Sequence, residues 1–185
     1  KWNTVFSAII GATTLTMAWF AQPYFGQIEL PVSFYGVAWA ILNLSVGIAA
    51  MFAWKYESFF GIPKTVLTFT FVIFSTFVAL TFVPGYVGLA VLLLFYLARG
   101  LATPTLRNYI NIITTSDVRA TVLSVRNFLI RLIFAITGPI WGWMSDRYTL
   151  NTAMLSAAII YGVLAFISVY FFIKHKTYEP DPAKG

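Results

Sequence analysis

Residues 152–173 read TAMLSAAIIYGVLAFISVYFFI, a run of apolar and small polar residues without a charged side chain. A helix that crosses a hydrocarbon core of about 30 Å needs roughly 20 such residues. A run of this length and composition is typical of a membrane-spanning helix. Five earlier segments pass the same test, so this stretch is the last of six predicted spans.

The six predicted spans are 4–21, 32–54, 65–83, 86–106, 120–144 and 152–173. Prolines and glycines between them mark the turns. Backbone amides in lipid must be paired within their own segment, which favours helices over open strands. We therefore expect an all-α integral membrane protein, with a six-helix bundle over residues 1–173. Residues 174–185 are predicted to form a polar, disordered cytoplasmic tail.

The composition excludes several classes of function. Apolar residues make up 59% of the chain and charged residues 10%, whereas soluble domains carry about 25% charged residues. There is no cysteine, and the one histidine, His175, lies in the tail. Thiol chemistry, cysteine metal sites and histidine catalysis have no residues to use, so we expect neither an enzyme nor a bound cofactor or metal. The net charge of +6 is spread thinly, so no nucleic-acid partner is expected.

The basic residues predict the orientation in the membrane. Eight of the twelve fall at the termini or in the second and fourth connections, and these are Lys1, Lys55, Lys64, Arg107, Arg119, Lys174, Lys176 and Lys184. With six spans these positions share one face, and the opposite face holds Arg147 alone. Because basic residues stay on the cytoplasmic side, both termini are predicted to be cytoplasmic, in a multi-pass protein of the cell membrane.

A weak internal repeat agrees with this layout. A shift of 89 residues aligns the corner at 54–59, WKYESF, with the corner at 143–148, WMSDRY. Both read Trp, two residues, an acid, one residue and an aromatic. The two corners fall on opposite sides of the membrane, as two inverted three-helix repeats require.

The second half of the chain carries a more specific pattern. It reads LARG at 97–100, RATVLS at 119–124 and GPIWGWMSDRY at 138–148. The chain resembles one six-helix half of a major facilitator superfamily transporter, well over the last three spans and mainly by layout over the first three. The resemblance implies secondary active transport of a small solute by alternating access. It also implies that the first, second, fourth and fifth helices face a central cavity, while the third and sixth face lipid.

Two departures from the family pattern refine this interpretation. The loop at 55–61, KYESFFG, is a degraded form of the Gly-x-x-x-Asp-Arg loop expected in a first half, which favours the second half. The family has twelve spans, whereas this chain has six and begins at Lys1. We therefore expect a fragment whose partners are the missing six-helix half or a second copy, the lipid bilayer and a small-molecule substrate. The alternative that the chain is a complete six-helix protein stays open.

Arg131 is the predicted substrate anchor. It follows Arg119 by twelve residues and precedes Ser145 by fourteen, about 18 Å and 21 Å along a helix, so it lies near the midplane. An arginine facing lipid there costs at least about 2.5–3.5 kcal/mol. We therefore expect Arg131 to face the bundle interior beside Asn127. Its partner is an anionic group on an anionic or zwitterionic solute, or an acid of the missing half, and we favour the solute.

Other polar residues inside the spans are weaker candidates. Arg99, Asn43 and Gln22 are predicted to line the substrate path, although packing explains Arg99 equally well. Arg126 lies about 10 Å deeper than Arg119, within reach of the headgroups by snorkelling, and we expect it to do so. No Asp or Glu lies within a span, so a proton-coupling carboxylate is expected in the missing half.

The fifth span also contains candidates for conformational change. Gly138 and Gly142 have the small-residue spacing that allows close helix approach, with Pro139 between them. In the family, such a segment is associated with the packing that governs alternating access, and a passive notch is the competing interpretation. Asp146 and Arg147 are expected to shape the outer corner before the sixth span without touching substrate.

One other class of function competes with a transporter half. A substrate-binding subunit of a vitamin uptake complex is also a six-helix membrane protein of about this length. It would expose a small-residue face to a coupling subunit. Intramembrane proteolysis needs a Ser–His pair or paired Asp residues, and the spans hold neither. A channel filter signature is also missing.

Overall fold

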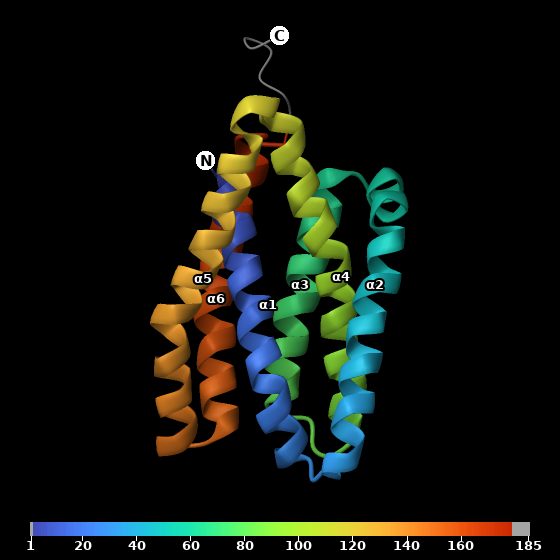
Figure 1. Ribbon diagram of the computed structural model, residues 1–185, viewed down its shortest axis with the longest axis vertical. Helices are drawn as coiled ribbons and strands as arrows, with labels where there is room; N and C mark the ends of the chain where they lie inside the picture. Colours follow the sequence, from blue (N-terminus) through green and yellow to red (C-terminus); the bar gives the residue numbers. More distant parts are fainter. Residues whose placement is uncertain (1, 179–185) are drawn as a thin grey trace.

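The computed structural model describes residues 2–178, and six long α-helices hold most of them (Figure 1). The helices are α1 (Trp2–Gln27), α2 (Tyr35–Phe60), α3 (Ile62–Leu80), α4 (Val87–Ile113), α5 (Ser116–Arg147) and α6 (Leu150–Lys174), and a short 3-10 turn, η1 (Val32–Phe34), precedes α2. All six are long and apolar enough to cross a membrane, which confirms the predicted count.

Most of the helices are longer than the predicted spans. α1 continues through Pro23 to Gln27, and α5 extends beyond the predicted span at both ends to reach 32 residues. Membrane helices tolerate proline because neighbouring groups can satisfy the freed carbonyl. The predicted tail starts inside α6, whose last residue is Lys174. His175 then stacks on Phe171, and residues 179–185 of that tail lie outside the described residues.

The chain runs up and down, so that α1 begins and α6 ends at the same end of the bundle (Figure 1). The connections between α2 and α3 and between α4 and α5 lie at that end as well. Basic residues from five helices fall there, and they are Lys55, Lys64, Arg107, Arg119 and Lys174. Arg147 ends α5 at the opposite end. We call these the basic end and the opposite end.

Two helices, α1 and α4, hold the bundle together. α1 packs against α5 and α6, α4 packs against α2 and α3, and α3 contacts α6 behind them. Aromatic pairs such as Phe6–Phe69 and Phe77–Phe95 fill the space between α1, α3 and α4. α1 is the most buried helix, whereas α2 and α5 flank the bundle with most of their surface exposed.

The burial of the α3 phenylalanines differs from the expectation that this helix faces lipid. Phe69, Phe74 and Phe77 are buried in the core, whereas Phe71 is exposed, as is Phe82 just after the helix. α3 packs against both α4 and α6, so one of its faces is internal. The outward surface of α6 remains apolar, with Ile159, Val163, Phe166, Ile167 and Tyr170 exposed.

A glycine sets the closest approach between α2 and α4. A Cβ added at Gly100 would lie 2.6 Å from the Val46 carbonyl oxygen and 2.7 Å from the Ala49 Cβ. Contacts this short with backbone cannot be relieved by a rotamer change. Gly100 therefore lets α2 lie directly on α4, next to the half-buried Arg99.

Candidate functional site

α1 and α5 run side by side in the same direction from the basic end (Figure 1). Three contacts mark their interface along its length. Arg126 meets Ser7, the Ile130 side chain fills the space that a Cβ of Gly11 would need, and the Trp19 and Phe134 rings stack at 5.7 Å. Beyond the stacked rings the helices separate and a cavity opens.

Arg126 is buried against α1, so the prediction that it snorkels is wrong. Only 7% of the side chain is exposed, and its Nε donates a hydrogen bond to the Ser7 hydroxyl. Its Nη1 donates to the Asn127 side-chain oxygen at 3.2 Å. Arg107 of α4 lies near enough for its charge to act on Arg126. The guanidinium is therefore held by Ser7 of α1 and does not extend towards the headgroups.

Arg131 lies at the midpoint of α5, but it does not face the bundle interior. Its side chain is exposed, and Asn127 one turn earlier is exposed as well. Arg126 and Trp141 are the only α5 residues that are buried. Five residues rotate a helix by about 140°, so when Arg126 faces α1, Arg131 turns away from it.

The other predicted substrate residues are dispersed. Gln22 is exposed on α1, and Asn43 is exposed on α2, where its amide donates to the Trp39 carbonyl at 2.9 Å. Arg99 of α4 is half-buried, with its guanidinium carbon 5.4 Å from the centre of the Tyr96 ring. Within residues 2–178, no hydrogen bond joins any two of the five predicted substrate residues.

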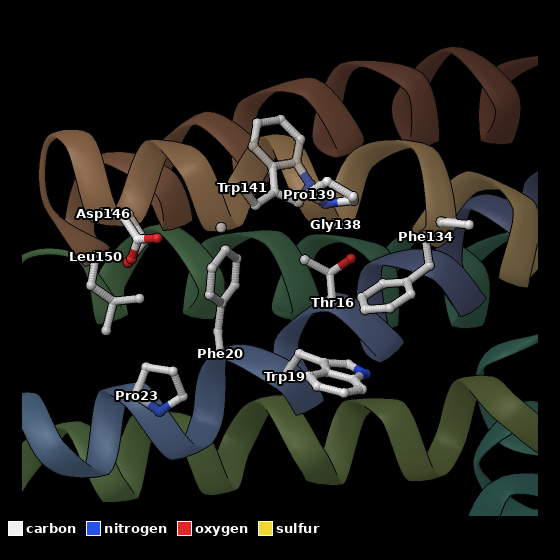
Figure 2. Close-up of a pocket in the computed structure, with 13 residues that line it drawn as sticks. Thr16, Trp19, Phe20, Pro23, Phe134, Gly138, Pro139, Trp141, Asp146 and Leu150 are labelled. Carbon is white, nitrogen blue, oxygen red and sulfur yellow. The ribbon is translucent and has the colours of Figure 1, made fainter.

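A cavity of about 500 Å³ separates α1 from α5 towards the opposite end. Figure 2 shows Trp19, Phe20 and Pro23 of α1 facing Phe134 and other residues of α5 across it. The residues predicted to control packing, Gly138, Pro139, Gly142 and Asp146, line it. Arg147 is exposed and does not.

The two glycines do not make the close helix approach that their spacing predicted. A Cβ added at Gly142 would meet nothing within 4 Å. At Gly138 the nearest atom would be 3.5 Å away, in the Phe134 ring of the same helix. In this structure, Gly138 and Gly142 therefore enlarge a cavity and do not form a contact.

A buried polar cluster, formed by Thr16, Thr137, Trp141 and Tyr161, joins α1, α5 and α6 beside the cavity. The Tyr161 hydroxyl lies 2.6 Å from the Thr137 oxygen, 3.1 Å from the Thr16 oxygen and 3.4 Å from the Trp141 Nε1. The Thr137 hydroxyl donates its hydrogen bond to the Ile133 carbonyl at 2.7 Å. Tyr161 must therefore donate to Thr137 and accept from Thr16 and Trp141.

Sequence reasoning missed this cluster and the aromatic wall of the cavity. Thr16 and Tyr161 are 145 positions apart, and no local pattern pairs them. One usable signal was available. Pro23 and Pro139 both lie inside membrane-length helices, and both line the cavity. Residues 2–178 contain no group of three or more His, Asp or Glu side chains able to hold a metal.

Comparisons with protein-family models, with curated proteins and with solved structures find no match.

Replacing Tyr161 with phenylalanine is expected to lower the free energy of unfolding by about 1–3 kcal/mol, because Thr16 and Trp141 lose their buried acceptor. Thermal unfolding in detergent measures the effect. Tyr170→Phe on the same helix is the matched control, since its side chain is exposed. Equal stability of the two variants would show that the cluster does not hold α5 and α6 to α1.

Proposed function

We propose that this chain is one six-helix half of a secondary transporter of the major facilitator superfamily, which moves a small anionic or zwitterionic solute by alternating access. The observation that carries the proposal is Arg131, an exposed guanidinium at the midpoint of a 32-residue helix of membrane length. The proposal also agrees with the sequence resemblance in the last three helices.

The energetics of Arg131 exclude lipid as its neighbour. An arginine at the bilayer centre costs at least about 2.5–3.5 kcal/mol when it faces hydrocarbon. Within the described chain no acidic side chain pairs with it, and α5 turns it away from the other helices. The surface around Arg131 must therefore face water or another protein surface. A second six-helix unit, covering α2 and α5 and enclosing an aqueous path, provides both.

The helix contacts support an internal two-fold relation. The exchange pairs α1 with α4, α2 with α5 and α3 with α6. Under it, the contacts that α1 makes with α5 and α6 become those that α4 makes with α2 and α3. The two similar corners of the sequence fall at equivalent places, because Trp54 and Trp143 both lie near the ends of α2 and α5. We infer two inverted three-helix repeats, the arrangement common in such transporters.

The surroundings of Arg131 suit an anion. The Asn127 oxygen accepts from Arg126, which leaves the two amide N–H groups of Asn127 free to donate outward. Arg131 follows one helical turn later with the planar fork that matches a carboxylate or phosphate. Arg126 thus acts as a positioning residue for Asn127 and adds positive charge behind the site.

The basic end is proposed to be cytoplasmic, in a multi-pass protein of the cell membrane. The chain has no native cysteine, so single-cysteine variants can be labelled without background. Cysteines at Glu57 and Asp117 are expected to react with an impermeant maleimide only from inside the cell. Cysteines at Glu29 and Asp146 are expected to react only from outside. A mixed pattern would contradict the topology.

Arg131→Ala is expected to weaken the apparent affinity for the transported anion about 10- to 100-fold, because a hydrogen bond to a charged group contributes about 1.5–3 kcal/mol. Arg131→Lys should retain part of it, since the charge remains but the fork is lost. Uptake of a panel of small carboxylates and phosphate esters into vesicles by the full-length protein with both six-helix units, corrected for expression, measures this.

Lys64→Ala is the control for loss of a positive charge, because Lys64 is exposed near the start of α3 at the basic end. Wild-type uptake by both Arg131 variants would rule out the anchor role. Recovery of Arg131→Ala by neutralising one acid of the second unit would identify an ion pair between the units instead.

A further inference from the structure

We propose that the cavity between α1 and α5 is a binding site for an organic cation with an apolar body, separate from the anion site at Arg131. Asp146, the charged residue of the cavity lining, lies fifteen residues after Arg131 along α5, which is about 22 Å of helix, whereas the aromatic part of the lining begins at Phe134, three residues after Arg131. The lining does not include Arg131, so the cation site does not rest on the proposed transport function.

The cavity offers an apolar surface with aromatic rings. Trp19 and Phe20 of α1 and Phe134 of α5 contribute aromatic rings to its lining, and the Trp19 and Phe134 rings stack on each other. Their faces suit an apolar body, and aromatic faces also attract a cationic centre. A volume of about 500 Å³ accommodates a small organic molecule.

Two of the hydrogen-bond donors that line the cavity are used within the protein. Thr16 and Trp141 both line it, but each donates to the Tyr161 hydroxyl. The indole nitrogen of Trp19 lies on the side of its ring away from Asp146 (Figure 2). Ser145, whose hydroxyl can donate or accept, is the remaining polar side chain beside Asp146.

Acceptors, in contrast, remain available. Pro23 and Pro139 have no N–H, so the carbonyls of Trp19 and Ala135 lack their usual helical donors. Both of these residues line the cavity. A helix carbonyl freed in a membrane needs another donor, and a ligand in the cavity that carries N–H groups can provide one.

Asp146 sets the sign of the ligand charge. It is the one charged residue among those that line the cavity, and Figure 2 shows its carboxylate at one end of the lining. Neighbouring Arg147 does not line the cavity. A carboxylate, two freed carbonyls and aromatic faces together favour an ammonium group with an attached apolar body over an anion or a sugar.

The test uses benzyltrimethylammonium as the cationic probe and phenylmethanesulfonate as an anionic probe of similar shape. Isothermal titration calorimetry of the membrane-extracted protein in a neutral detergent is expected to show saturable binding of the cation only. Asp146→Asn should weaken cation binding at least about tenfold, the effect of losing one ion pair in a partly desolvated site. Asp117→Asn, on the same helix at the other end of the bundle, should leave it unchanged.

Gly142→Leu provides a second variant that keeps Asp146 in place. Its side chain would enter open space in the cavity and should abolish binding of the cation without lowering the melting temperature. Arg131→Ala should leave cation binding unchanged, so that failure of the anion site and failure of the cavity site are seen separately. The proposal is overturned by non-saturable binding of the cation, by equal binding of the sulfonate, or by wild-type affinity in both Asp146→Asn and Gly142→Leu.

Discussion

A positive charge in the middle of a membrane must have a polar neighbour, and this requirement decides how the bundle is understood. Two of the four arginines of α5, Arg126 and Arg131, lie five residues apart, and the helix directs them to different surroundings. Arg126 finds Ser7 on α1 and becomes part of the packed interface. Arg131 finds no acidic partner in the described chain and is exposed. The first arginine shows how α5 is attached to α1, and the second is the basis for proposing that another unit covers α5.

The interface between α1 and α5 changes character along its length. At the basic end the helices are joined by a buried hydrogen bond, and in the middle by the close fit of Ile130 on Gly11. Towards the opposite end they diverge, and Tyr161 of α6 takes over the connection through Thr16 and Thr137. The cavity opens where direct contact between α1 and α5 ends. An interface joined at one end and open at the other is compatible with the proposed alternating access, in which such a helix pair would change its spacing.

Hydropathy predicted the number and type of the helices because the membrane imposes a length and a charge limit on each span. The rotation of a helix was harder to predict. The surface of α5 is apolar nearly all the way round, with Phe128, Leu132 and Ile136 exposed beside Arg131. No apolar stripe therefore indicated which side faced α1, so the place of Arg131 along the helix followed from counting residues while its direction did not. The polar cluster around Tyr161 was missed because its members meet only after folding.

The central claim is that the exposed surface of α5 at mid-membrane faces a polar path, whereas that of α6 faces lipid. A nitroxide at Asn127→Cys, compared with one at Val163→Cys, tests it by electron paramagnetic resonance, since both positions are exposed near the middle of their helices. In the membrane-embedded protein, the α5 label should be relaxed mainly by a water-soluble nickel chelate and the α6 label mainly by oxygen. If oxygen dominates at both positions, α5 faces lipid and the account of Arg131 is wrong.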